Sequence, residues 1–160
     1  MPYSVRTQRL LLAASLLWAA FVFGQSLLPG HVSSSESGFI VRLLQLFPGS
    51  SGWDLERVEH LVRKAAHFTE YAVLGILYLL AARSRGAIRG RMTLPLFWGL
   101  LTPVADESLQ LLVEGRTGQL TDVLIDFSGV LTGMAVCLLI LWLRLRVKKS
   151  AEALDKGKPC

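Results

Sequence analysis

Four long apolar runs divide the chain, and polar or charged segments separate them. The runs cover residues 10–28, 63–82, 94–113 and 120–143. A helix needs about 20 mostly apolar residues to cross the hydrocarbon core of a bilayer. The pattern therefore predicts an all-α fold: an integral membrane bundle of four transmembrane helices, forming a single transmembrane domain over residues 1–150. Residues 151–160 are polar, and we expect a disordered C-terminal tail there.

The segment between the first two runs is more polar but contains one short amphipathic stretch. Its apolar positions recur at helical spacing: Phe39, Ile40, Leu43, Leu44 and Phe47. Arg42 and Gln45 fall on the opposite side. This pattern predicts a short amphipathic helix in the first outer loop, lying on the bilayer surface. A second amphipathic stretch, residues 55–61, leads into the second run.

Charge sets the expected orientation and the expected partners. The net charge is +5, but the basic residues flank apolar runs and are not interleaved with exposed aromatics, so we expect no nucleic-acid partner. Twelve of the 17 Lys and Arg residues lie before the first run, in the 83–91 loop and after the fourth run. Short positively charged segments stay in the cytoplasm. A multi-pass protein of the inner membrane with both termini cytoplasmic is predicted, with membrane lipids as partners.

Under this topology, the ionisable residues inside the runs all lie at the outer end of their helices. In the second run, Lys64, His67 and Tyr71 share one helical face. In the fourth run, Asp122 and Asp126 continue into a Gly129-x-x-x-Gly133 step, which lets another helix approach closely. Charges at membrane depth cost about 2.5–3.5 kcal/mol each and normally mark function. The outer end therefore contains a candidate site.

The residue types suggest two roles at this site. The candidate catalytic residues are His67, Glu70, Asp106, Glu107 and Asp122. The candidate substrate-binding residues are Arg63, Lys64, Tyr71, Gln110, Arg116 and Asp126. The cations suit a phosphate or pyrophosphate head group, and Glu70 or Glu107 could act as general base with His67 as acid. His67 and the Asp residues could hold a divalent metal ion, but their spacing matches no known metal motif, so no metal ligand is assigned and the cofactor is left unknown.

The ordered series of polar motifs resembles the VanZ-like membrane protein family. The series runs Arg63-Lys64-x-x-His67-Phe68-x-Glu70-Tyr71, Asp106-Glu107-x-x-Gln110, Arg116, and Asp122-x-x-x-Asp126-x-x-Gly129-x-x-x-Gly133. At the position of Asp126, Asn is expected in this family at least as often as Asp. The resemblance implies a bacterial cell-envelope protein. It also implies a link to antibiotic resistance, through reduced susceptibility to the lipid-tailed glycopeptide teicoplanin, which acts on cell-wall precursors outside the membrane.

Two classes of function remain open, and whether the chain is an enzyme stays undecided. It is either an enzyme or transfer protein for a lipid-linked cell-wall precursor at the outer leaflet, or a non-catalytic module that binds a lipid, a lipoglycopeptide or a partner protein. In the second case, the polar cluster is a structural ion-pair network. The sequence has no nucleophile elbow, P-loop or H-E-x-x-H, which favours the second class modestly. A proton-coupled transporter is disfavoured because the inner halves of the runs are almost wholly apolar.

Overall fold

The computed structural model describes residues 3–28, 38–46, 54–86, 92–113, 116 and 118–156. Four long helices account for most of them: α1 (Val5–Ser26), α3 (Leu55–Ser84), α4 (Thr93–Gln110) and α5 (Leu120–Lys156). A short helix covers residues 38–44, and the described ranges contain no β-strand. The all-α prediction is confirmed.

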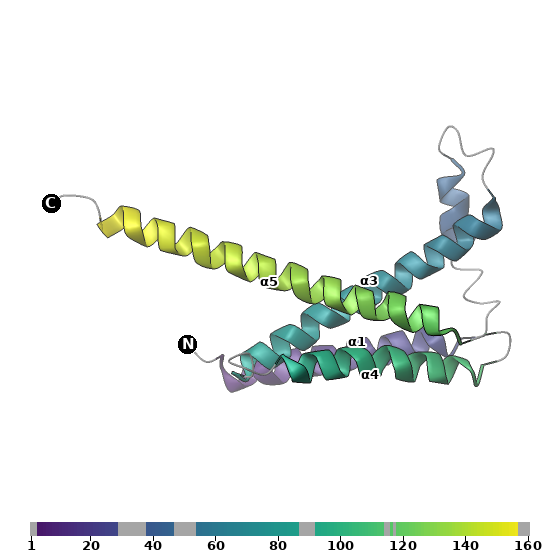
Figure 1. The fold of residues 1–160 in the computed structure, drawn as a ribbon, viewed down its shortest axis with the longest axis horizontal. Coiled ribbons are helices and arrows are strands. Elements are labelled where there is room, and N and C mark those ends of the chain that lie inside the picture. The colour runs from purple at the N-terminus through teal and green to yellow at the C-terminus, as the bar shows by residue number, and fades with distance from the viewer. Residues whose placement is uncertain are drawn as a thin grey trace.

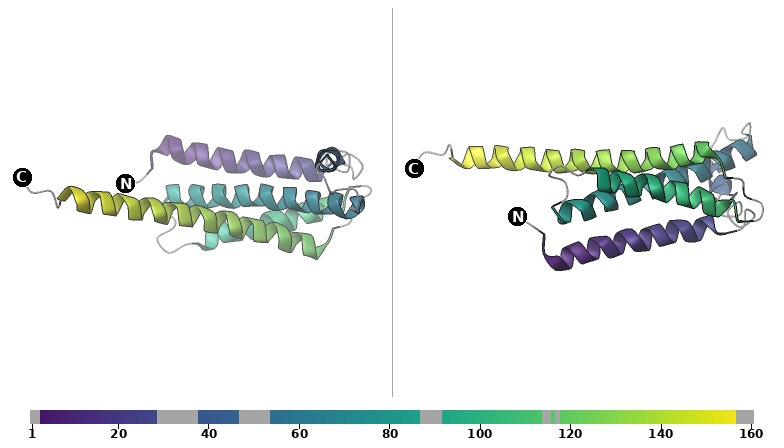
Figure 2. Two further views of the ribbon diagram at one scale, coloured as in Figure 1. Left: turned by 90° about the horizontal axis from the view of Figure 1, so that it is seen from above. Right: turned by 60° about the horizontal axis from the view of Figure 1, so that its bottom comes forward.

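The long helices alternate in direction along one axis (Figure 1). Both ends of the chain lie at the same end of the bundle, as the two further views in Figure 2 also show. We call this the proximal end, where α1 begins and α3 ends. The opposite, distal end is where α1 ends at Ser26 and α5 begins at Leu120. Helices α3 and α4 each contact the other three long helices.

Local capping fixes where two of the helices begin. The Ser4 side chain accepts a hydrogen bond from the Thr7 amide at 3.1 Å, and Asp54 accepts one from the Arg57 amide at 3.4 Å. Such N-caps satisfy amides that have no partner within the helix. Because Asp54 caps α3, the amphipathic stretch at residues 55–61 becomes its first two turns. The second predicted span is therefore part of a 30-residue helix.

Three of the described helices are long and apolar enough to cross a membrane: Val5–Ser26, Leu55–Ser84 and Leu120–Ala151. Helix α4 is not among them, so four transmembrane helices are not confirmed. It has 18 residues, which at 1.5 Å each span about 27 Å, slightly less than a typical hydrocarbon core. Its last turns also contain Asp106, Glu107 and Gln110, which lower its mean hydropathy.

The short helix at residues 38–44 lies where the amphipathic helix is expected, but its placement on a bilayer is not confirmed. Val41 is buried, whereas Phe39, Ile40 and Leu43 are exposed. Some expected features fall outside the described residues: Phe47 of the predicted amphipathic helix, and Arg89 and Arg91 of the basic loop at residues 83–91.

Helix α5 extends past the predicted domain boundary at residue 150. Helix α5 continues to Lys156 and therefore includes residues 151–156, where the sequence predicts a disordered tail. The reason is local: Ala151, Glu152, Ala153 and Leu154 are strong helix formers that follow an established helix, so they extend it without a new nucleation step. Residues 157–160 lie outside the described part of the chain.

Glycines allow α3 and α5 to cross at very short distance. A Cβ on Gly129 would collide with the backbone of Phe68, and one on Gly133 would collide with the backbone of Ala72. From the other side, a Cβ on Gly75 would collide with the backbone of Val130. The predicted close approach at the Gly129-x-x-x-Gly133 step is confirmed, and α3 is the partner helix.

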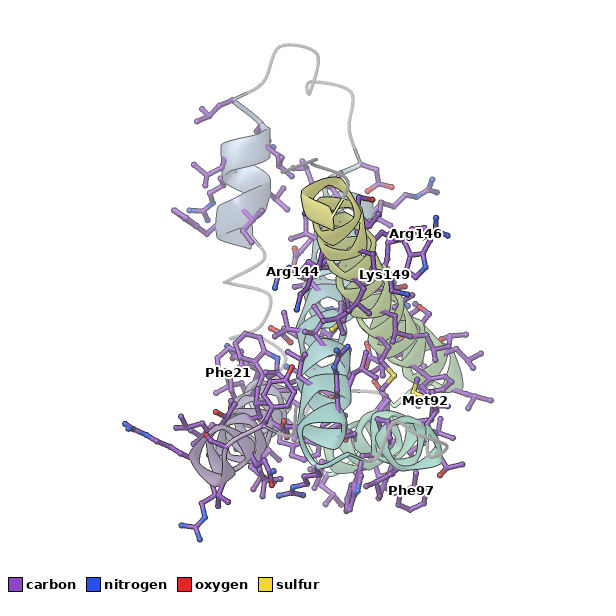
Figure 3. The ribbon with its side chains drawn as sticks, turned by 90° about the vertical axis from the view of Figure 1, so that its left-hand side faces the viewer. Phe21, Met92, Phe97, Arg144, Arg146 and Lys149 are labelled. Atoms are coloured by element: carbon purple, nitrogen blue, oxygen red, sulfur yellow. The ribbon has the colours of Figure 1, made fainter. Side chains whose placement is uncertain are left out.

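The outside of the bundle is apolar. Figure 3 shows Phe21 of α1 and Phe97 of α4 at its periphery, and both rings are about half exposed or more, at 46% and 59%. Arg144, Arg146 and Lys149 follow on the part of α5 that extends past the other helices (Figures 1 and 3). The Arg146 guanidinium lies 4.6 Å from the centre of the Trp142 ring. An apolar exterior with an aromatic and basic border is typical of a membrane protein.

Candidate functional site

Polar contacts join all four long helices and the α4–α5 connection at the distal end. Ser26 at the end of α1 donates a hydrogen bond to Asp106 Oδ2 of α4 at 2.8 Å. Lys64 Nζ of α3 lies 2.6 Å from Asp122 Oδ1 of α5. Arg116 donates to the backbone carbonyls of Leu28 at 3.0 Å and Gln25 at 3.3 Å. These contacts bring together residues that are far apart in the sequence.

A small polar pocket opens among these contacts, with a volume of about 110 Å³. We call it the distal pocket. Basic and amide side chains from α3, α4 and the α4–α5 connection line it, together with three carboxylates: His60, Arg63, Lys64, His67, Glu107, Gln110, Arg116, Gln119, Asp122, Ile125 and Asp126. Since cations and carboxylates line one cavity, the pocket can bind an anion and act on it with acid–base groups.

The buried carboxylate network has Asp106 at its centre. Its side chain is 0% exposed, and Ser26 is equally buried. Gln110 Nε2 donates to Ser26 Oγ at 3.4 Å, so Gln110, Ser26 and Asp106 form a hydrogen-bonded chain. Oδ2 of Asp106 is thereby paired, whereas Oδ1 has no hydrogen-bond partner among the described residues. The chain fixes the orientation of the carboxylate and leaves one oxygen available.

Further unpaired atoms lie close to Asp106. Buried side-chain atoms without a hydrogen-bond partner in the described part of the chain are His67 Nδ1, Tyr71 Oη, Asp106 Oδ1 and Asp126 Oδ2. Tyr71 is 0% exposed and Asp126 is 2% exposed. Buried polar atoms are nearly always paired in native proteins. Four unpaired atoms contributed by three helices therefore mark this point as unusual.

The cations of the pocket differ in how they are held. Lys64 is paired with Asp122, and both side chains are partly exposed. Arg63 Nη2 lies 3.3 Å from His60 Nδ1, at the exposed rim. Burial lowers the pKa of Arg116, and the neighbouring positive charge of Arg63 lowers it further, while Asp106 and Glu107 act in the opposite direction. Arg63 and Arg116 are thus two cations near enough to repel, and an anion between them would relieve that repulsion.

The two candidate general bases are placed differently. Glu107 is 7% exposed and lines the distal pocket, and its Oε2 accepts a hydrogen bond from the Gln119 amide at 3.0 Å. Glu70 is on α3 but is not part of the pocket lining, and its backbone carbonyl accepts a hydrogen bond from Trp18 Nε1 at 2.9 Å. The geometry favours Glu107 over Glu70 as a group that contacts a bound molecule.

The family of the chain follows from a match over most of its length. A family model described as VanZ/LLP1 matches residues 11–142, which include every helix that contributes to the distal pocket. The chain belongs to the VanZ/LLP1 family. No curated protein and no solved structure matches it. The resemblance inferred from the motifs is confirmed.

In this VanZ-family chain, the structure gathers most of the predicted site residues. The predicted residues that line the distal pocket are Arg63, Lys64, His67, Glu107, Gln110, Arg116, Asp122 and Asp126. Asp106 and Tyr71 are buried beside it, outside the lining, and Glu70 is also outside the lining. What each residue does chemically stays a prediction.

Sequence reasoning did not assign three residues of the site. Ser26 holds Asp106, while His60 and Gln119 line the pocket. A signal existed for Ser26, because it is a polar residue at the outer end of an apolar run, at the depth of the other polar groups. His60 precedes the predicted span and Gln119 belongs to a loop, so only the folded chain places them here.

One group of side chains in this VanZ-family site has the composition of a metal centre. Among the described residues, His67, Asp106 and Asp126 each place a possible ligand atom within 4.8 Å of the others. They come from α3, α4 and α5, so their sequence spacing gives no motif.

Proposed function

We propose that this VanZ-family protein is a multi-pass protein of the bacterial cell membrane that binds a lipid-linked phosphate or pyrophosphate of the cell envelope. In this proposal, both termini are cytoplasmic, α4 is a fourth span and the distal pocket faces the outer leaflet. The single observation that supports it best is the distal pocket, where Arg63, Lys64 and Arg116 surround a cavity that also contains buried acids.

The distribution of charge supports the orientation. Basic residues lie at the proximal end of the bundle. Arg83 and Arg85 are at the end of α3, and Arg144, Arg146 and Lys149 are in the C-terminal part of α5. Basic residues next to membrane spans favour the cytoplasmic side. The distal pocket lies at the other end, and the short helix at residues 38–44 follows α1 there, with the exposed apolar side chains expected of a helix at the outer surface.

The pocket residues support a division of roles. Arg63 and Arg116 would bind the anionic head group, since a guanidinium binds phosphate oxygens in a bidentate manner. Glu107, held by the Gln119 amide, would act as general base, and His67 as general acid. The hydrocarbon chain of the bound lipid could remain in the bilayer or lie in an apolar groove of about 610 Å³ between α1, α3 and α4.

The decisive experiment compares the lipids of living cells. Membrane lipids and cell-wall precursors are measured by mass spectrometry in cells that express wild type, Glu107→Gln or Glu56→Gln at matched membrane levels. Glu56 lies in the first turn of α3, is exposed and does not line the pocket. A lipid-linked species changed by wild type and Glu56→Gln, but not by Glu107→Gln, supports the proposal. Identical profiles in all three strains contradict it.

Teicoplanin susceptibility follows as a second readout of the same strains. If the bound species is a cell-wall precursor or the lipid tail of the antibiotic, expression of wild type raises the inhibitory concentration of teicoplanin and Glu107→Gln does not. An unchanged inhibitory concentration with a changed lipid profile would separate this chain from resistance.

The orientation has its own test. In a variant without Cys137 and Cys160, Ser50→Cys should react with a membrane-impermeant thiol reagent added to whole cells, and Ala87→Cys should not. Reaction at residue 87 from outside would place the distal pocket in the cytoplasm.

The Lys64–Asp122 ion pair favours a second candidate, a non-catalytic binding module or scaffold. At 2.6 Å this pair connects α3 to α5 directly, as a structural ion-pair network would. Under this alternative, Asp122→Asn and Glu107→Gln both reduce the amount of folded protein in the membrane. Under the main proposal, protein levels hold and only the lipid profile changes.

A further inference from the structure

Two buried carboxylates approach each other beside the distal pocket. Asp106 of α4 is 0% exposed and Asp126 of α5 is 2% exposed. One oxygen of each lies within 4.8 Å of the other and of a ring nitrogen of His67. Where water is excluded, two negative charges at this separation repel strongly. A proton or a cation must therefore accompany the pair.

The nearby basic side chains are engaged elsewhere. Lys64 pairs with Asp122 at 2.6 Å, and Arg116 donates to two backbone carbonyls of the α1 terminus. Neither the Arg57–Asp54 ion pair nor the Lys64–Asp122 ion pair includes Asp106 or Asp126. Lys64 and Arg116 thus do not supply a counter-charge in contact with this carboxylate pair.

Unpaired lone pairs at the same point indicate what the counter-charge is. Asp106 Oδ1, Asp126 Oδ2 and His67 Nδ1 have no hydrogen-bond partner among the described residues. The buried hydroxyl of Tyr71, one helical turn beyond His67 on α3, lies beside Asp106 and interacts with it. A shared proton would satisfy one pair of these atoms, whereas a metal ion satisfies several at once. The gathering of unpaired atoms from three helices favours the metal ion.

We propose that His67, Asp106 and Asp126 bind a divalent first-row metal ion, Mn²⁺ or Zn²⁺. One imidazole and two carboxylates suit these ions, and three protein ligands leave a coordination position open, as in catalytic sites. His67 and Asp126 also line the distal pocket, so the open position faces the cavity that contains Arg63 and Arg116. The metal site deepens the proposed function, because a phosphate oxygen of the bound lipid could fill the open position. Only this last point rests on the proposed function.

A supporting residue is already in place for one of the ligands. Metal-binding carboxylates are usually held by hydrogen bonds from a second layer of residues. Ser26 donates to Asp106 Oδ2 at 2.8 Å and leaves Oδ1 without a hydrogen-bond partner among the described residues. Ser26→Ala should therefore weaken metal binding by about 10- to 100-fold, the range found when such supporting residues are removed.

The test uses the full-length protein purified in detergent, stripped with EDTA and then titrated with Mn²⁺ or Zn²⁺. We expect one ion per chain in the wild type, measured by inductively coupled plasma mass spectrometry after removal of free metal. Asp126→Asn should lose the bound ion. Asp54→Asn is the matched control, because Asp54 is an exposed N-cap of α3 and Asn caps as well as Asp. Equal metal content in Asp126→Asn and wild type overturns the site.

A measurement on the wild type alone protects the test against variants that do not fold. Electron spin echo spectroscopy of bound Mn²⁺ reports directly coordinated nitrogen. We expect coupling to the nitrogen of a single imidazole, removed by stoichiometric Zn²⁺. Bound Mn²⁺ without any nitrogen coupling overturns the assignment of His67.

The two proposals fail separately. If the purified chain binds one metal ion but the lipid profile of expressing cells does not change, the metal site is upheld and the lipid function is overturned. A lipid profile that depends on Glu107, with a purified chain that binds no metal, overturns the metal site alone.

Discussion

The distal and proximal halves of the bundle are built from the same helices but differ in the hydrogen bonding of their buried polar groups. In the proximal half, the buried polar side chains are paired: Ser15 donates to the Leu11 carbonyl at 2.8 Å, and Tyr78 and Thr102 share a hydrogen bond of 2.8 Å. In the distal half, four buried atoms have no partner among the described residues. Paired polar groups stabilise a fold, whereas unpaired buried groups cost stability and are retained where they bind something.

The cavities differ in the same way. The proximal groove between α1, α3 and α4 has a volume of about 610 Å³ and is lined mostly by Leu, Ala, Phe and Trp side chains. The distal pocket has only about 110 Å³ but is lined mostly by ionisable and amide side chains. The comparison indicates that the ionisable side chains are gathered at one end of the bundle, while the other end is packed from apolar side chains. The following substitutions test that separation.

The largest effect is expected at the α3–α5 crossing, where the two halves meet. Gly133→Ala introduces a Cβ that collides with the Ala72 backbone, and a backbone cannot rotate away. Overpacking of this kind typically costs about 1–3 kcal/mol, so we expect a lower temperature of thermal unfolding in detergent. Gly24→Ala is the control, since a Cβ there has no atom within 4 Å. Equal unfolding temperatures for both variants would show that the crossing is not tightly packed.

The next effect compares one polar pair from each half. Ser26→Ala leaves Asp106 Oδ2 and Gln110 without their shared partner, which costs about 1–3 kcal/mol for a buried group. Tyr78→Phe removes a bond of 2.8 Å, but Thr102 keeps its bond to the Trp98 carbonyl, so the cost is about 0.5–1.5 kcal/mol.

Stability alone does not separate this second pair, so the lipid profile of expressing cells is measured as well. We expect Ser26→Ala to abolish the change in that profile and Tyr78→Phe to retain it. If Tyr78→Phe abolishes it too, the chemistry is not restricted to the distal half.

A smaller effect on stability is expected from the distal ion pair. Lys64 and Asp122 are 24% and 30% exposed, so water screens their attraction and Lys64→Met should cost about 1 kcal/mol or less. Chemical unfolding of the purified protein measures this change. A loss of several kcal/mol would instead identify the pair as part of the structural core and favour the scaffold alternative.

The smallest effect is expected on the outer surface. Leu17 of α1 is 72% exposed, so Leu17→Ala removes contacts with surrounding lipid and detergent but none within the core. The free energy of unfolding should change by about 0.5 kcal/mol or less, as at other exposed positions. A larger loss would reveal a contact with another protein chain at this face.

The sequence by itself determined the helical class, the family and the gathering of polar residues at one end of the bundle. Apolar runs of about 20 residues predict membrane helices because an unpaired backbone cannot exist in hydrocarbon. The 3.6-residue period placed Lys64, His67 and Tyr71 on one face and identified the Gly129-x-x-x-Gly133 step as a contact. Helix ends were less well predicted, since they depend on local capping by Asp54 and on the helix propensity of residues 151–156.

Only the tertiary structure decided which polar residues meet. His67, Asp106 and Asp126 lie on three helices, and their relative positions depend on how deeply α3 and α5 interlock at the glycines. The same crossing pairs Lys64 with Asp122, while Ser26 reaches Asp106 across the α1–α4 contact. Sequence spacing cannot give these distances, because helical periodicity fixes positions within one helix, whereas the rotation and offset between helices follow from packing in three dimensions.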